Sequence, residues 1–130
     1  MLSIAVFLLA QASSSLADDA AAEIQENPAL MRTLEAKTGA FVRCGRRALE
    51  SRIASEAGST DLSSVSPEAA ADMLTRAMHK AVQDCDVDGN AARIVPDIRN
   101  ALPNKYQPFA TDAARAYLYQ LIGMSLWGVP

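Results

Sequence analysis

The chain has 130 residues, of which half are hydrophobic and 21% are charged, and its net charge is −3 at pH 7. This composition is typical of a globular domain, and the small negative charge argues against a general nucleic-acid binder, which needs a cationic face. Only 5% of the residues are aromatic, alanine is abundant, and few runs of β-branched residues are visible. We therefore expect an all-α fold, a small helical bundle of about four helices.

The N-terminal residues have the features of a secretory signal peptide. Residues 2–10 are apolar, Ser15-Leu16-Ala17 fits the small-x-small cleavage pattern, and two aspartates follow it. The usual positive n-region is missing, because the first Lys or Arg of the chain is Arg32. The apolar run is shorter than the roughly 20 residues that a membrane-spanning helix needs. We expect export to the periplasm or the medium; a buried N-terminal helix is the alternative.

This interpretation divides the chain into a signal peptide at 1–17, an N-terminal tail at 18–28 and a single helical domain at 29–130, with no transmembrane span in the mature chain. Apolar spacing and turn residues predict four helical segments in the domain. They are Ala29–Ala57, Pro67–Asp84, Ala91–Leu102 and Phe109–Trp127. Ser66 is the expected N-cap of the second segment, and the third is expected to bend or to start again at Pro96. One apolar face of the second segment carries Met73, Leu74, Ala77, Met78, Ala81 and Val82.

The two cysteines, Cys44 and Cys85, predict one disulfide bond in an exported chain. If the first two helices form an antiparallel hairpin, the cysteines lie at depths that differ by about 7 Å, an offset that the connecting loop can absorb. Arginines at 43, 46 and 47 flank the first cysteine, and aspartates at 84, 86 and 88 flank the second. The bond would therefore bring opposite charges together. Two free buried thiols are the alternative.

The aspartates also suggest a calcium site. Asp84, Asp86 and Asp88 are followed by Gly89, which matches the first half of an EF-hand loop. The twelfth position should hold a bidentate glutamate, and here it is Val95. The competing interpretation is the acidic end of a helix, a turn at Gly89 and an N-cap for the next helix at Asn90.

The sequence offers no recognisable catalytic constellation. His79 is the single histidine and falls on the polar side of its predicted helix, and the chain contains no HExxH, no CxxC and no glycine-rich phosphate loop. We expect no catalytic residues and no required cofactor, calcium being the one candidate. The last segment is different, because no charge occurs between Ala116 and Val129. Its Tyr117, Leu121 and Trp127 are candidate interface residues, with core packing as the alternative.

These observations favour a small exported binding protein that is not an enzyme. Its partner would be another envelope protein or a second copy of itself, and its role that of an inhibitor, immunity-type or accessory protein. The alternatives are an envelope stress chaperone or structural dimer, a calcium-binding protein, and an enzyme whose acid and base residues follow no recognised motif.

Overall fold

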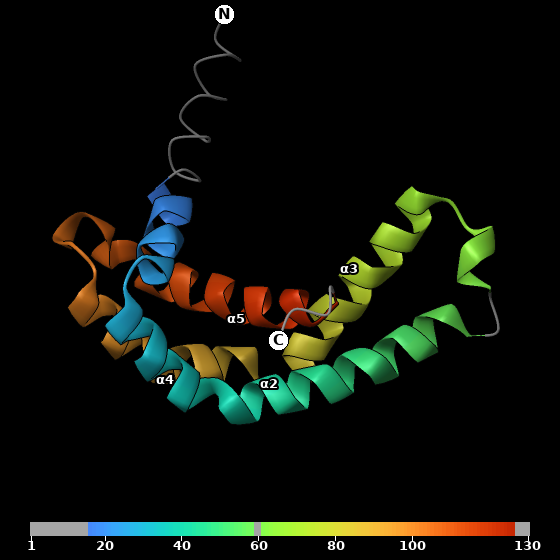
Figure 1. Cartoon of the computed structure of the whole chain (residues 1–130), viewed down its shortest axis with the longest axis horizontal. Coiled ribbons are helices and arrows are strands. Elements are labelled where there is room, and N and C mark those ends of the chain that lie inside the picture. Colours follow the sequence, from blue (N-terminus) through green and yellow to red (C-terminus); the bar gives the residue numbers. More distant parts are fainter. Residues whose placement is uncertain (1–15, 59–60, 127–130) are drawn as a thin grey trace, which may run out of the picture. The chain divides into compact units, whose positions relative to one another are not determined.

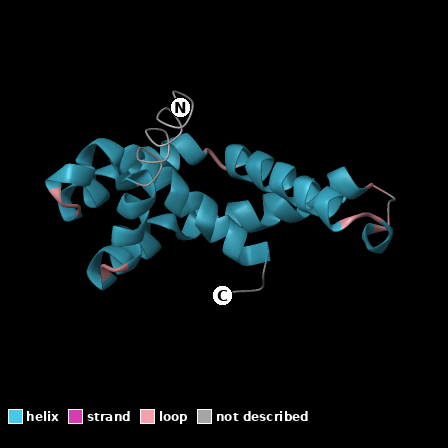
Figure 2. Ribbon diagram, turned by 90° about the horizontal axis from the view of Figure 1, so that it is seen from above, coloured by secondary structure: helices cyan, strands magenta, loops and turns pink. Residues whose placement is uncertain are grey.

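A computed structural model of the chain describes residues 16–58 and 61–126, and within these ranges the fold is all-α, as predicted (Figures 1 and 2). It has five α-helices rather than about four, and no strand among the described residues. The first helix covers residues 16–25. The others are α2 (Pro28–Ala57), α3 (Pro67–Asp84), α4 (Val87–Ala101) and α5 (Ala110–Leu126), with short 3₁₀ helices at Leu62–Ser64 and Asn104–Phe109.

The additional helix comes from the segment that we expected to be a tail. Ala20 and Ile24 are fully buried there, and their i, i+4 spacing places both on one face. The helix is separated from α2 by Asn27, whose Oδ1 accepts a hydrogen bond from the Leu30 N–H at 3.0 Å. The tail at 18–28 is thus largely packed helix, which the sequence analysis missed. Most of the predicted signal peptide, residues 1–15, lies outside the described residues.

The helices form two compact units. Unit 1 contains the described residues up to Lys37 together with Ala91–Tyr117, and unit 2 contains Thr38–Asn90 and the described residues from Leu118 onward. Helices α2, α4 and α5 each contribute residues to both units. Neither unit is therefore a separate stretch of sequence.

Unit 1 has an aliphatic core and a polar periphery. Its buried side chains include Leu30, Leu34, Ile94, Ile98, Leu102 and Tyr106. Lys37 Nζ lies 2.6 Å from Asp97 Oδ2 and links α2 to α4 at the surface. Helix α4 continues through Pro96, where the sequence predicted a bend or a restart. The exposed position of this proline lets the helix tolerate it without a buried unsatisfied carbonyl.

Unit 2 is built on the predicted antiparallel hairpin of α2 and α3. Ser66 caps α3, as predicted, because its Oγ accepts a hydrogen bond from the Ala69 N–H at 3.1 Å and a proline follows at the first helical position. Cys44 and Cys85 form the predicted disulfide, with their Cα atoms 5.9 Å apart. The bond therefore joins the middle of α2 to the C-terminal end of α3.

Two sets of ion pairs also connect α2 to α3. Arg52 donates two hydrogen bonds to the Asp84 carboxylate, at 2.8 and 2.7 Å. Glu56 accepts a hydrogen bond from Lys80 at 2.6 Å and lies 3.5 Å from Arg76. The hydrogen bond from Arg52 lowers the pKa of Asp84, and that from Lys80 lowers the pKa of Glu56. Exposed pairs contribute little stability each, but their geometry defines which faces of the two helices meet.

Helix α5 approaches α2 closely at Gly45. A Cβ atom built on Gly45 would overlap Cδ1 of Ile122 and lie 3.0 Å from its Cγ1. Ile122 is fully buried, so its side chain has little freedom to move aside. The glycine costs helix propensity in the middle of α2, and the close packing of α5 explains why it is there.

We predict opposite effects for two glycine substitutions in α2. Gly45→Ala should destabilise the protein by about 1–3 kcal/mol, because the new methyl group overpacks the contact with Ile122. Gly39→Ala is the matched control: its Cβ would lie 3.3 Å from Nη1 at the flexible end of Arg43. That substitution should be neutral or stabilising by up to about 1 kcal/mol. Urea denaturation of both variants measures the difference, and equal stabilities would contradict the close contact at Gly45.

Loss of the disulfide should strongly destabilise the chain. The bonded cysteines are 41 residues apart in sequence, and closing a loop of that size corresponds to about 4 kcal/mol in the chain-entropy model. We expect the double variant Cys44→Ala, Cys85→Ala to have a clearly lower melting temperature than the oxidised protein. Adding a reductant should lower the melting temperature of the natural chain and leave that of the variant unchanged. A melting temperature that neither the double substitution nor the reductant lowers would contradict a stabilising role of the disulfide.

Candidate functional site

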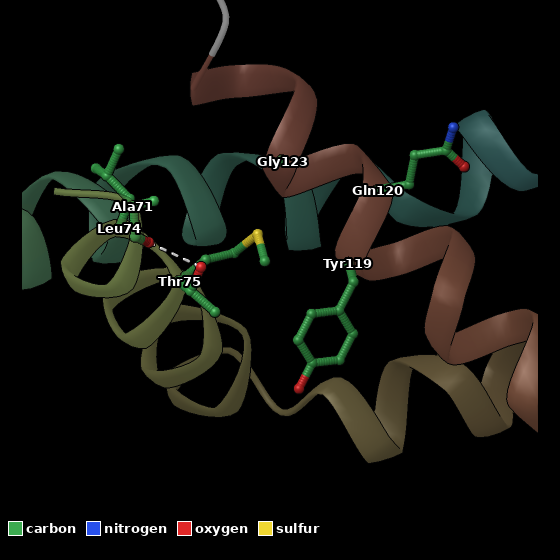
Figure 3. A pocket seen from close by; sticks show the side chains of 7 residues that line it. Ala71, Leu74, Thr75, Tyr119, Gln120 and Gly123 are labelled. Carbon is green, nitrogen blue, oxygen red and sulfur yellow. Dashed lines mark hydrogen bonds between the residues drawn. The ribbon is translucent and has the colours of Figure 1, made fainter. Parts of the chain in front are cut away.

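Unit 2 contains a groove of about 490 Å³ between α3 and α5 (Figure 3). Four of its lining residues come from α3 and three from α5. They are Ala71, Leu74, Thr75 and Met78, and Tyr119, Gln120 and Gly123. A volume of this size lies within the range of roughly 300–1,000 Å³ that is typical of binding pockets.

The groove is chemically apolar, although two hydroxyl groups line it. The Thr75 hydroxyl donates its proton to the Ala71 carbonyl at 2.9 Å, so its donor is used within α3 (Figure 3). The Tyr119 hydroxyl lies 3.0 Å from Nδ1 of His79 and is hydrogen-bonded there. Apolar residues make up most of the remaining wall, and Gln120 adds one amide group. Such a surface favours an apolar occupant, because a polar one would lose its hydrogen bonds with water.

Met78 and Gly123 face each other across the groove. A Cβ atom added to Gly123 would lie 3.7 Å from Sδ of Met78, which is an ordinary van der Waals distance. The missing side chain at Gly123 therefore keeps the groove open, and a larger residue would begin to fill it. The flexible thioether of Met78 can adapt its shape to different apolar partners.

Tyr119 lines the groove, and His79 of α3 packs against it. Their rings stack with centroids 5.8 Å apart and an angle of 27° between the planes. The second ring nitrogen, Nε2, lies 3.2 Å from Nε2 of Gln83, one turn further along α3. His79 is exposed, in agreement with its predicted place on the polar side of the helix. Its polar contacts hold the tyrosine ring against α3, a positioning role that needs no catalytic chemistry.

The acidic segment has three separate roles in the structure. Asp84 is bound by Arg52, and not by one of the predicted partners, the three arginines beside Cys44. Asp86 accepts a hydrogen bond from the Gly89 N–H at 3.1 Å, and Asp88 lies in the first turn of α4. Within the described part of the chain, no group of three or more His, Cys, Asp or Glu side chains is placed to hold a metal ion. The calcium interpretation therefore gains no support from the geometry.

The turn between α3 and α4 differs from the prediction at Asn90. Asp86, rather than Asn90, caps α4, and its φ of +56° puts it in the left-handed region. Asn90 lies inside α4, where its side-chain amide donates to the carbonyl groups of Cys85 and Asp86 at 3.0 and 2.9 Å. Gly89 is helical, and a Cβ atom there would overlap the Asp86 carboxylate. The glycine is thus required by the cap and not by a turn.

The three candidate interface residues of the last helix differ in exposure. Tyr117 has only 2% of its surface exposed and belongs to the core. Leu121 is half-buried. Trp127 lies outside the described residues. The core interpretation thus applies to Tyr117, whereas Leu121 keeps part of its surface accessible and does not line the groove.

The groove was not identified from the sequence, although part of its signal was visible. Of the apolar face predicted for α3, Met73, Ala77, Ala81 and Val82 are buried. Leu74 and Met78 are only half-buried, and both line the groove. The apolar stripe on α3 is therefore wider than the surface that its neighbours cover.

No protein-family model, no curated protein and no solved structure matches this chain. Over the described residues, no helix combines the length and apolar character needed to cross a membrane. The groove and its chemistry are therefore the basis for a functional proposal.

Substitution of Asp86 should separate its capping role from metal binding. Asp86→Ala should destabilise the protein by about 1–2 kcal/mol, because it removes the helix cap. Alanine is also unfavourable at positive φ, and its side chain makes no hydrogen bond that compensates for this. Asp86→Asn should retain most of the stability, because asparagine both caps helices and tolerates this conformation. Thermal melts in EDTA and in millimolar calcium measure both effects. A calcium-dependent rise in the melting temperature that Asp86→Ala abolishes would show that the segment binds the ion.

Proposed function

We propose that this chain is a small exported binding protein, without catalytic activity of its own, that acts on another protein of the cell envelope. The observation that carries the proposal is the apolar groove between α3 and α5, whose two hydroxyl groups are satisfied internally. A concave apolar pocket of this volume is the kind of surface at which ligands and partners bind. An inhibitor, an immunity-type protein or an accessory protein would use such a groove.

The disulfide supports the exported location. Bonds such as Cys44–Cys85 persist in oxidising compartments and are rare in the cytosol. A periplasmic or secreted protein is also consistent with the sequence features of residues 1–17. The disulfide closes the hairpin of α2 and α3, and α3 supplies one wall of the groove, so oxidation after export would stabilise that wall.

Site-specific crosslinking in the producing cell tests this function. A photoreactive amino acid is placed at Gln120, an exposed residue that lines the groove, and at Ala69, an exposed residue of α3 that does not. We expect one envelope protein to be crosslinked in stoichiometric amount from position 120 and not from position 69. Mass spectrometry of the crosslinked band then identifies the partner.

The other outcomes overturn the proposal in different ways. Crosslinks from position 120 only to a second copy of the chain would indicate a structural dimer. Crosslinks to many envelope proteins, increasing at low pH, would indicate a stress chaperone. Equal crosslinks from both positions, or none, would show that the groove is not a docking surface. Fractionation of the same cells tests the exported location independently.

A further inference from the structure

The dimensions of the groove suit a helical partner. Its lining along α3 extends from Ala71 to Met78, which corresponds to about 10 Å at the rise of an α-helix. A docked helix with apolar residues at i, i+4 and i+7 spreads its anchors over the same length. The groove also runs between two helices with small residues on both sides, Ala71 on α3 and Gly123 on α5, and such residues let a third helix approach closely.

The groove is less suited to an extended peptide. An extended segment leaves its backbone N–H and C=O groups unpaired unless it adds to the edge of a sheet. The described residues contain no strand, and the hydroxyl groups of Thr75 and Tyr119 already have partners. A helix satisfies its own backbone and presents only side chains to an apolar wall.

One side of the groove is negatively charged. Thr75 lies seven residues after Glu68 and three after Asp72, so both carboxylates are on the side of α3 next to the groove. Both side chains are exposed, and neither forms an ion pair within the described residues. The nearby cations of α3, Arg76 and Lys80, are both bound to Glu56. Carboxylates at i and i+4 repel each other, and a cation placed between them would relieve the repulsion.

We propose that the groove between α3 and α5 binds an amphipathic helix of the partner protein, with its apolar face on Leu74, Met78 and Gly123 and a positively charged flank beside Glu68 and Asp72. This inference rests on the proposed function and specifies the chemistry of the partner. The apolar contacts supply most of the affinity, and the charges determine the orientation of the bound helix and its rate of association.

Two synthetic peptides test the charge preference. Both are 18-residue amphipathic helices with the same leucine face, and their polar flanks carry lysine in one and glutamate in the other. Binding to the oxidised full-length protein is measured by fluorescence anisotropy at low and high salt. We expect the lysine peptide to bind about three- to tenfold more tightly at low salt, which corresponds to one or two surface ion pairs, and the difference to shrink at high salt. Equal affinities, or tighter binding of the glutamate peptide, would overturn the charge assignment.

Substitutions locate the binding site and exclude general attraction to an acidic protein. Ala71→Leu and Gly123→Leu, made separately, each fill the groove. Each should weaken the binding of the lysine peptide at least about tenfold, because the apolar anchors of the peptide no longer fit. Ala69→Leu, a matched substitution outside the groove on the same helix, should have no effect. The double variant Glu68→Lys, Asp72→Lys should reverse the preference between the two peptides. Circular dichroism and melting temperatures verify that each variant is folded, and a variant that is not folded is replaced by Ala71→Val or Gly123→Ala.

The results separate this inference from the function on which it rests. If Ala71→Leu and Ala69→Leu bind the lysine peptide equally, the helix does not occupy the groove and the inference is wrong. If a partner is crosslinked from position 120 but contacts the groove through an extended or acidic segment, the proposed function stands and this inference is wrong. If no partner is crosslinked from position 120 and filling the groove changes the affinity of neither peptide, the proposed function and this inference are both wrong.

Discussion

The disulfide between Cys44 and Cys85 is the constraint on which unit 2 depends. Cys85 is the C-cap of α3, and α4 begins two residues later, so the bond attaches the end of one helix and the start of the next to the middle of α2. Gly45, the next residue along α2, is the point at which Ile122 of α5 makes its closest approach. Four helices are therefore held near one site by a covalent bond, a tight turn and a glycine contact. Small domains bury a limited apolar core. The covalent bond therefore adds stability at the centre of unit 2 that core packing would otherwise have to provide.

The groove is a consequence of how α3 is covered. Its side toward the disulfide and the core is buried at Met73, Ala77, Ala81 and Val82. The adjoining side carries Leu74 and Met78, which neighbouring side chains cover only in part. Tyr119, which lines the groove, contacts His79 and so links α5 to α3. The packing that buries one side of α3 thus leaves Leu74 and Met78 partly exposed beside the carboxylates of Glu68 and Asp72. The proposed mode of binding uses both the apolar residues and the carboxylates.

The three aspartates of the acidic segment make different local interactions. Asp84, Asp86 and Asp88 alternate as calcium ligands do, yet one is held by Arg52, one caps α4 and one lies in the first turn of that helix. A carboxylate near a helix N-terminus is favoured by the unpaired N–H groups there, and this local interaction explains the last two without an ion. Calcium binding by this segment stays a prediction, and Val95 stands where the motif places its bidentate glutamate.

The sequence by itself determined the all-α class, the start of α3 at its Ser66 cap, the hairpin and the pairing of the two cysteines. These features follow from interactions within a few residues, or from there being only one possible pair of thiols. Three features were not predicted from the sequence. They are the helix at 16–25, the partner of Asp84, and the contact between His79 and Tyr119. The last of these joins residues 40 positions apart, and no local pattern encodes such a contact. Only the tertiary structure decided which part of the apolar stripe on α3 is buried and which part remains as a groove, because burial depends on the helices that pack against it and not on the periodicity of the stripe.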